Sequence, residues 1–79
     1  MPHPPGDDSL RHDLRAIGDR LRVARLRRNR TQESVFLAAG VARSTYQEIE
    51  AGTTDARIGT LIRIARALGV HVADLLRDR

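Results

Sequence analysis

The segment from Thr31 to Gly52 constrains the fold of this chain more than any other, because it holds two helix-length stretches separated by three residues that begin with a glycine. The first stretch, QESVFLAA, follows Thr31, a residue type that caps helices, and stops at Gly40. The second stretch, RSTYQEIEA, begins three residues after Gly40 and stops at Gly52. The sequence therefore predicts two short helices, at 32–39 and 43–51, joined by a tight turn.

Helical spacing of apolar residues continues on both sides of this segment. Ser9 suits an N-cap, and apolar residues recur after it at helical intervals, namely Leu10, Leu14, Ile17, Leu21 and Ala24. We expect helices at 10–28 and 58–68 and a short fifth helix at 72–77. No segment alternates with a period of two, so the sequence predicts an all-α domain of five helices over residues 9–79. Residues 1–8, which hold all three prolines, are expected to form a disordered tail.

Composition narrows the classes of function. Cysteine is absent and the three histidines lack metal-ligand spacing, so we expect neither a metal site nor a cofactor. The chain shows no nucleophile–base pair, phosphate loop or paired carboxylates, so we expect no enzyme. No apolar run could span a membrane and the first residues do not resemble a signal peptide, which predicts a cytoplasmic protein. All 14 basic residues are arginine and the formal net charge is +4, which favours a polyanionic partner, although a GC-rich genome explains the arginine bias equally well.

The stretch at 43–51 separates into two sides when its residues are placed about 100° apart around a helix. One side is expected to pack on a core and gathers Ala42, Thr45, Tyr46 and Ile49. The other side carries mostly hydrogen-bonding groups, from Arg43, Ser44, Gln47 and Glu48, together with Ala51. Two short helices joined by a glycine-containing turn form a helix-turn-helix, whose second helix can enter the major groove of DNA. The polar side is thus expected to contact base edges, with a solvated helix face as the alternative.

Two segments, TQESVFLAAGVARSTYQEIEAG and TLIRIARALGVHVADLL, resemble the Cro/repressor (Xre-type) helix-turn-helix domain of bacteria and phages. The resemblance covers about residues 17–76. Its most specific parts are TQE at 31–33, the Gly40–Val41 turn, IExG at 49–52 and IARALGV at 64–70. It implies a compact, five-helix, lambda-repressor-like domain that binds double-stranded DNA in a sequence-specific way. The implied protein is a transcriptional repressor or regulator that acts as a homodimer.

The resemblance also implies roles for individual residues at matching positions. Gln32 would touch a phosphate and brace the reading helix. Arg43, Ser44 and Glu48 would read bases, with Gln47 nearby. An arginine can bond guanine O6 and N7 together, and a glutamate can accept a hydrogen bond from a cytosine amino group.

Two further residues match an internal ion pair of the family. Glu50 stands where the family has a buried acid, and Arg25 stands where it has the basic partner on the first helix. Elsewhere the chain departs from the family, since Phe36 and Ala39 exchange the usual small and large residues. A core tolerates such an exchange if the total volume is kept. The loop after Gly52 lacks the usual basic residues, so two phosphate contacts are expected to be weakened.

The C-terminal part of the chain predicts the oligomeric state. Val70, Val72, Leu75 and Leu76 are too apolar for a terminal helix that only one neighbour covers, which predicts a homodimer formed there. The weakened loop and Leu37, expected to be exposed, favour the alternative function: a protein-interaction module of the same fold, such as an antitoxin or adaptor with a protein partner.

Overall fold

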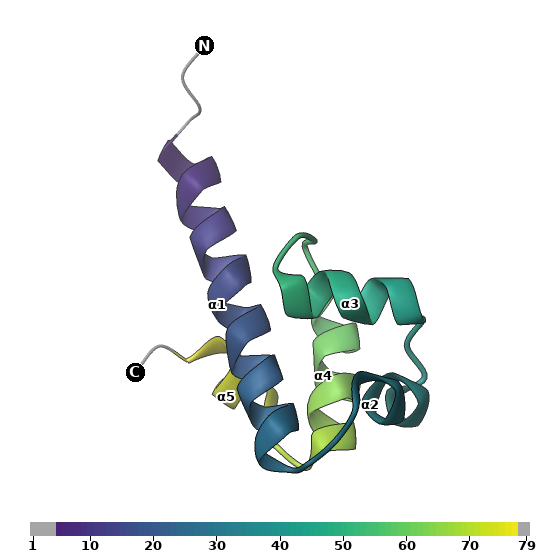
Figure 1. Ribbon diagram of the computed structural model, residues 1–79. Coiled ribbons are helices and arrows are strands. Elements are labelled where there is room, and N and C mark those ends of the chain that lie inside the picture. Colours follow the sequence, from purple (N-terminus) through teal and green to yellow (C-terminus); the bar gives the residue numbers. More distant parts are fainter. Residues whose placement is uncertain (1–4, 78–79) are drawn as a thin grey trace.

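The computed structural model describes residues 5–77, with side chains from Asp8 onward, and these residues form five helices and no strand (Figure 1). The elements are α1 (Pro5–Arg27), α2 (Gln32–Ala39), α3 (Arg43–Ala51), α4 (Ile58–Leu68) and α5 (Val72–Leu76). The all-α class and the bounds of α2, α3 and α4 are as predicted. In Figure 1 the long α1 runs along one side of the molecule, and its first turns extend beyond the other helices. None of the described helices is both long and apolar enough to cross a membrane.

The start of α1 corrects the sequence prediction. The helix begins at Pro5 rather than at Leu10, so residues 5–8 are helical and do not belong to a disordered tail. Proline is favoured in the first turn of a helix, where its missing N–H would have no partner, and an acidic residue such as Asp8 suits the positive end of the helix dipole. Residues 1–4, the rest of the predicted tail, lie outside the described residues. α1 ends at Arg27, and Asn29 follows it with a φ of 53°.

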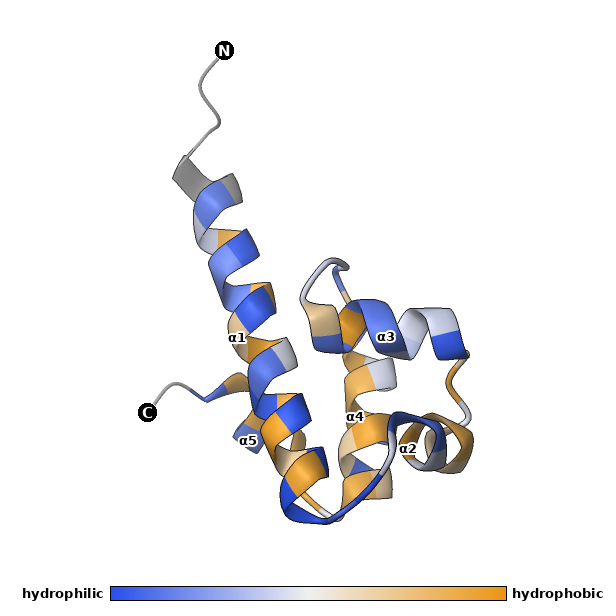
Figure 2. Ribbon diagram, in the orientation of Figure 1, coloured by the Kyte–Doolittle hydropathy of each residue, from blue (hydrophilic) through white to orange (hydrophobic). Residues whose placement is uncertain are grey.

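The hydrophobic core draws on every helix. The five largest fully buried side chains come one from each of α1 to α5, and they are Leu21, Val35, Tyr46, Ile64 and Leu75. Figure 2 shows the apolar residues of α2 and α4 gathered where the helices face one another, while the projecting end of α1 is largely hydrophilic. Both members of the predicted volume exchange, Phe36 and Ala39, lie in this core.

The turn between α2 and α3 is held by its glycine. Gly40 has a φ of 68°, a left-handed conformation that residues with a side chain rarely adopt. In that conformation the N–H groups of Gly40 and Val41 donate to the carbonyls of Leu37 and Phe36 and close the end of α2. At the other end, the Thr31 hydroxyl accepts a hydrogen bond from the Ser34 N–H at 3.0 Å, so the predicted cap is confirmed.

The crossing of α1 over the end of α3 depends on two glycines. A Cβ atom at Gly18 would collide with the carbonyl oxygens of Glu50 and, at 2.7 Å, of Ile49. A Cβ atom at Gly52, whose φ is 75°, would lie 2.7 Å from the Cα of Arg15. The two backbones therefore approach one another more closely than side chains would permit. This crossing fixes the C-terminal end of α3 against α1.

Replacing Gly18 with alanine tests the close crossing. We expect Gly18→Ala to lower the free energy of unfolding by about 1–3 kcal/mol, because the added methyl must push α1 away from α3. The matched control is Gly59→Ala, in the first turn of α4, where a Cβ atom would meet nothing within 4 Å. That variant should be neutral or up to about 1 kcal/mol more stable, as alanine's helix propensity dictates. Urea unfolding of the two variants gives both values, and equal changes would refute the close crossing.

Candidate nucleic-acid interface

The two sides of α3 differ sharply in burial. Tyr46, Ile49 and Glu50 are buried, with 0%, 2% and 6% of their surface exposed. The predicted reading residues all lie in solvent on the opposite side, and they are Arg43, Ser44, Gln47 and Glu48. One side of α3 is therefore anchored in the core, while its polar side faces solvent.

Two residues that the sequence assigned to the packed side are exposed. Ala42 and Thr45 lie on the wall of an open hollow of about 360 Å³ between the start of α3, the loop after Gly52 and α4. The prediction failed because α4 packs mainly against α2 and α5, leaving this edge of α3 uncovered. The packed side of α3 is consequently narrower than its apolar pattern suggests.

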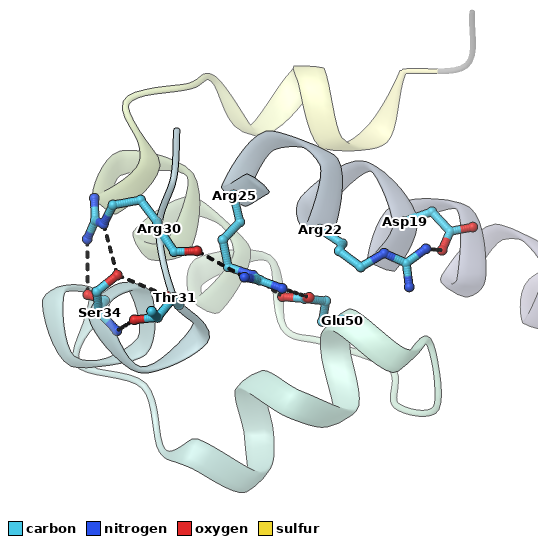
Figure 3. A network of polar contacts seen from close by, with 7 residues as sticks. All are labelled: Asp19, Arg22, Arg25, Arg30, Thr31, Ser34 and Glu50. Carbon is cyan, nitrogen blue, oxygen red and sulfur yellow. Dashed lines mark hydrogen bonds and ion pairs between the residues drawn. The ribbon is translucent and has the colours of Figure 1, made fainter. Parts of the chain in front are cut away.

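A buried ion pair joins α1 to α3, as the resemblance implied (Figure 3). The Arg25 guanidinium donates from Nε to Glu50 Oε2 at 3.1 Å and from Nη2 to Glu50 Oε1 at 2.7 Å. The Arg25 and Glu50 side chains are 12% and 5% exposed. A third donor, Arg25 Nη1, reaches the carbonyl oxygen of Arg30 at 2.9 Å, so the same side chain also holds the segment that leads into α2.

The surroundings of the pair set its ionisation. Burial alone would raise the pKa of Glu50, but the hydrogen bonds and the charge of Arg25, together with neighbouring polar side chains, outweigh it and hold the pKa below its ordinary value of 4.5. The Gln32 side chain, at the start of α2, contributes in the same direction. The hydrogen bond with Glu50 in turn raises the pKa of Arg25. Both partners therefore stay charged at neutral pH.

The Tyr46 hydroxyl lies buried beside this pair. Burial and the Glu50 carboxylate raise the pKa of Tyr46, so the phenol stays neutral. Its oxygen is buried and makes no hydrogen bond to any described residue. The prediction that Tyr46 belongs to the core and does not contact DNA is consistent with this burial.

Arg43 does not extend freely from the start of α3. Its Nη2 donates to Glu33 Oε2 on α2 at 3.2 Å, and its guanidinium carbon lies 5.5 Å from the centre of the Phe36 ring. The sequence indicates neither partner, because residues seven and ten positions away on another helix leave no periodic signal. Ser44, Gln47 and Glu48 have no such neighbours within the described residues.

Gln32 occupies the first position of α2 and is half-buried. Its side chain helps to lower the pKa of Glu50, and its predicted contact with a phosphate and its bracing of the reading helix stay predictions. No group of three or more histidine or acidic residues that could hold a metal ion occurs in the described part of the chain.

The match to a known protein family is consistent with this helix-turn-helix geometry. The helix-turn-helix family HTH_3 matches residues 21–75, from Leu21 in the second half of α1 to Leu75 near the end of α5. The chain belongs to this helix-turn-helix family. The resemblance drawn from the TQE, Gly40–Val41 and IExG motifs is confirmed.

Known proteins similar to this chain include a phage repressor and a restriction-modification controller protein. The transcriptional repressor RstR of the cryptic phage CTXphi, from Vibrio cholerae, is 34% identical over 62 residues, which make up 78% of this chain and 56% of the repressor. The chain thus spans about half the length of that relative. The crystal structure of the restriction-modification controller protein C.AhdI, from Aeromonas hydrophila, matches with a TM-score of 0.78 at 28% identity, over 81% of this chain and 97% of the controller.

Arg30 joins the start of α2 to the end of α4. Its guanidinium donates to the Ser34 hydroxyl at 2.9 Å and to the Ala67 carbonyl at 3.2 Å. Figure 3 shows it continuing the polar network that begins at Glu50.

Removing the charge of Glu50 tests the ion pair. We expect Glu50→Gln to lower the free energy of unfolding by about 3–5 kcal/mol at pH 7, because Arg25 is left buried without its partner. Since folding lowers the pKa of Glu50, its contribution is present above about pH 4.5 and is lost as the pH falls through the folded value. The difference between parent and variant should therefore shrink in acid.

The matched control is Glu48→Gln, which removes an exposed acid from the same helix and should change stability by less than about 0.5 kcal/mol. Urea unfolding between pH 3 and pH 7 measures all three proteins. A Glu50→Gln variant as stable as the Glu48→Gln variant at pH 7 would refute the pair.

Proposed function

We propose that this protein binds double-stranded DNA in a sequence-specific way, as a homodimeric transcription regulator that reads its site with the exposed side of α3. One observation carries the proposal: α3 is anchored through Tyr46, Ile49 and Glu50 while its opposite side presents only polar and small groups to solvent. Such a helix enters a major groove without disturbing the core. The family match and the two relatives point to a DNA-binding transcription regulator.

Individual residues take different parts in reading DNA. Arg43, at the start of α3, suits guanine, whose O6 and N7 accept from one guanidinium. Ser44 adds a polar contact, and Glu48, one turn further on, accepts from a cytosine amino group and repels other bases. Gln32 lies at the N-terminus of α2, where backbone N–H groups and the helix dipole favour a phosphate. These roles involve groups that bind and none that react, so the proposed function includes no catalysis.

An apolar groove between α1, α4 and the loop after α3 supports the homodimer. It has a volume of about 240 Å³, and its apolar lining comes mainly from α1, α4 and α5, including Leu10, Leu14, Ile17, Ile58, Leu61 and Leu76. Leu10, Ile58 and Leu76 are 47%, 56% and 44% exposed. A second copy would cover these side chains and place two reading helices about 34 Å apart, one turn of DNA.

This surface changes the predicted dimer contact. The sequence assigned Leu75 to the interface, but it is 1% exposed and packs in the chain's own core, since α5 contacts both α1 and α4. Val70 and Val72 are half-buried. Of the four residues, Leu76 is the one left exposed, so the proposed interface combines it with the start of α1.

The alternative, a protein-interaction module, rests on the loop after Gly52, which lacks the usual basic residues, and on Leu37. That leucine is 68% exposed on α2. A single exposed leucine is common on protein surfaces, so it does not support a second function by itself.

Binding-site selection from random duplexes tests the proposal. The parent should select an inverted repeat with half-site centres about one helical turn apart, because two copies read it together. Arg43→Ala should relax the preference at one base pair in each half-site by about 1–3 kcal/mol. It should lower the melting temperature only slightly, because the side chain and its contact with Glu33 are exposed.

A salt titration of binding provides the control. If Arg43 contacts only a phosphate, the variant will bind all sequences more weakly and will select the same bases with the same preferences as the parent. The slope of its log affinity against log salt concentration will fall by about one unit. A parent that selects no motif at any salt concentration would contradict the proposed function.

A further inference from the structure

The environment of Arg43 differs from that of the other exposed residues on α3. Its guanidinium is bound on one side by the Glu33 carboxylate at 3.2 Å and lies over the face of the Phe36 ring at 5.5 Å. Both the Arg43 and the Glu33 side chains are about two-thirds exposed, at 64% and 63%. The end of the arginine is thus held by α2 while its outer edge stays open to solvent.

The Phe36 ring is itself rigidly held. It is 7% exposed, and its centre lies 6.2 Å from the centre of the Tyr46 ring at an interplanar angle of 49°. Such a tilted aromatic pair packs favourably and fixes the orientation of both rings. A ring held in this way offers a stationary π face, which attracts a guanidinium. The unusual phenylalanine at this position therefore fills the core and also supports Arg43.

We propose that Glu33 and Phe36 are positioning residues, which hold the Arg43 guanidinium at the start of α3 before DNA arrives and so determine how strongly it selects its base pair. This inference rests on the proposed function of Arg43 as a base reader. An arginine with four free torsions loses entropy when it is fixed against a base edge. An arginine already fixed by an acid and a ring loses less, and it presents its donors in fewer wrong orientations.

Glu33 is expected to lower the affinity for DNA of any sequence and to raise the preference for one base pair. Because these are separate quantities, each can be measured. As an acid near phosphates it weakens binding to every sequence alike. As a partner of Arg43 it strengthens the preference for one base pair. Removing it should therefore raise affinity for unrelated DNA while lowering discrimination at that base pair.

The experiment measures binding of Glu33→Ala and Phe36→Leu to the selected duplex and to duplexes with single base-pair changes. Each variant should lose about fivefold in discrimination at the base pair that Arg43→Ala relaxes, the size typical of one exposed ion pair or cation–π contact. Discrimination at all other base pairs should stay as in the parent. In the free protein, ¹⁵N relaxation at Arg43 Nε should show an ordered side chain in the parent and a mobile one in both variants.

Two matched variants distinguish the positioning of Arg43 from a general change in charge or in stability. Asp55→Ala removes an exposed acid from the loop after α3 and should raise affinity for all duplexes without changing discrimination. Val35→Ala opens the core within α2 and should lower the melting temperature without changing discrimination.

The inference is overturned if Glu33→Ala and Phe36→Leu keep the parent's discrimination while Arg43→Ala loses it. If Arg43→Ala also matches the parent, the proposed reading role of Arg43 fails, and the inference fails with it. The pattern of the three variants thus shows which of the two statements is wrong.

Discussion

The ion pair between Arg25 and Glu50 joins the parts of this domain that bear on DNA reading. One guanidinium binds both carboxylate oxygens of Glu50 on α3 and the backbone carbonyl of Arg30 in the segment before α2. It thereby connects α1, α3 and the segment before α2 through a single side chain that is largely buried. In a small domain without disulfides, whose net stability is about 5–15 kcal/mol, breaking such a pair removes a large share of the total.

The two ends of α3 are held by different contacts and have different roles. At the C-terminal end, the absence of side chains at Gly18 and Gly52 lets α1 approach closely, and Glu50 is bound there. At the N-terminal end, α3 is supported by α2 through the contacts of Arg43 with Glu33 and Phe36. The helix is thus fixed at its far end and presents its start, which reaches furthest into a groove in helices of this kind.

Much of this arrangement could be predicted from the sequence because it depends on local signals. Thr31, Gly40 and Gly52 mark helix ends through their own backbone and side-chain chemistry, and α2, α3 and α4 begin and end where predicted. The Arg25–Glu50 pair followed from the family resemblance, since nothing in the spacing of 25 residues indicates it.

The remaining features depend on how helices pack, which the sequence does not encode locally. The exposure of Ala42 and Thr45 follows from α4 packing on α2, and the burial of Leu75 follows from α5 touching two helices. The partners of Arg43 lie on another helix. Gly18 and Gly59 both lie inside helical patterns, but a Cβ atom would meet a neighbouring backbone only at Gly18, so the glycine alone does not indicate the close approach.

The central claim is that α3 reads DNA with its exposed side while its other side holds the domain together. Titration of the ¹⁵N-labelled protein with its selected duplex, followed by amide chemical shifts, tests this most directly. The account predicts that the largest shifts fall on the start of α2 and on Arg43, Ser44, Gln47 and Glu48, while the amides of Ile64 and Leu75 change little. Shifts concentrated on α1, α4 or α5, with α3 unaffected, would contradict it.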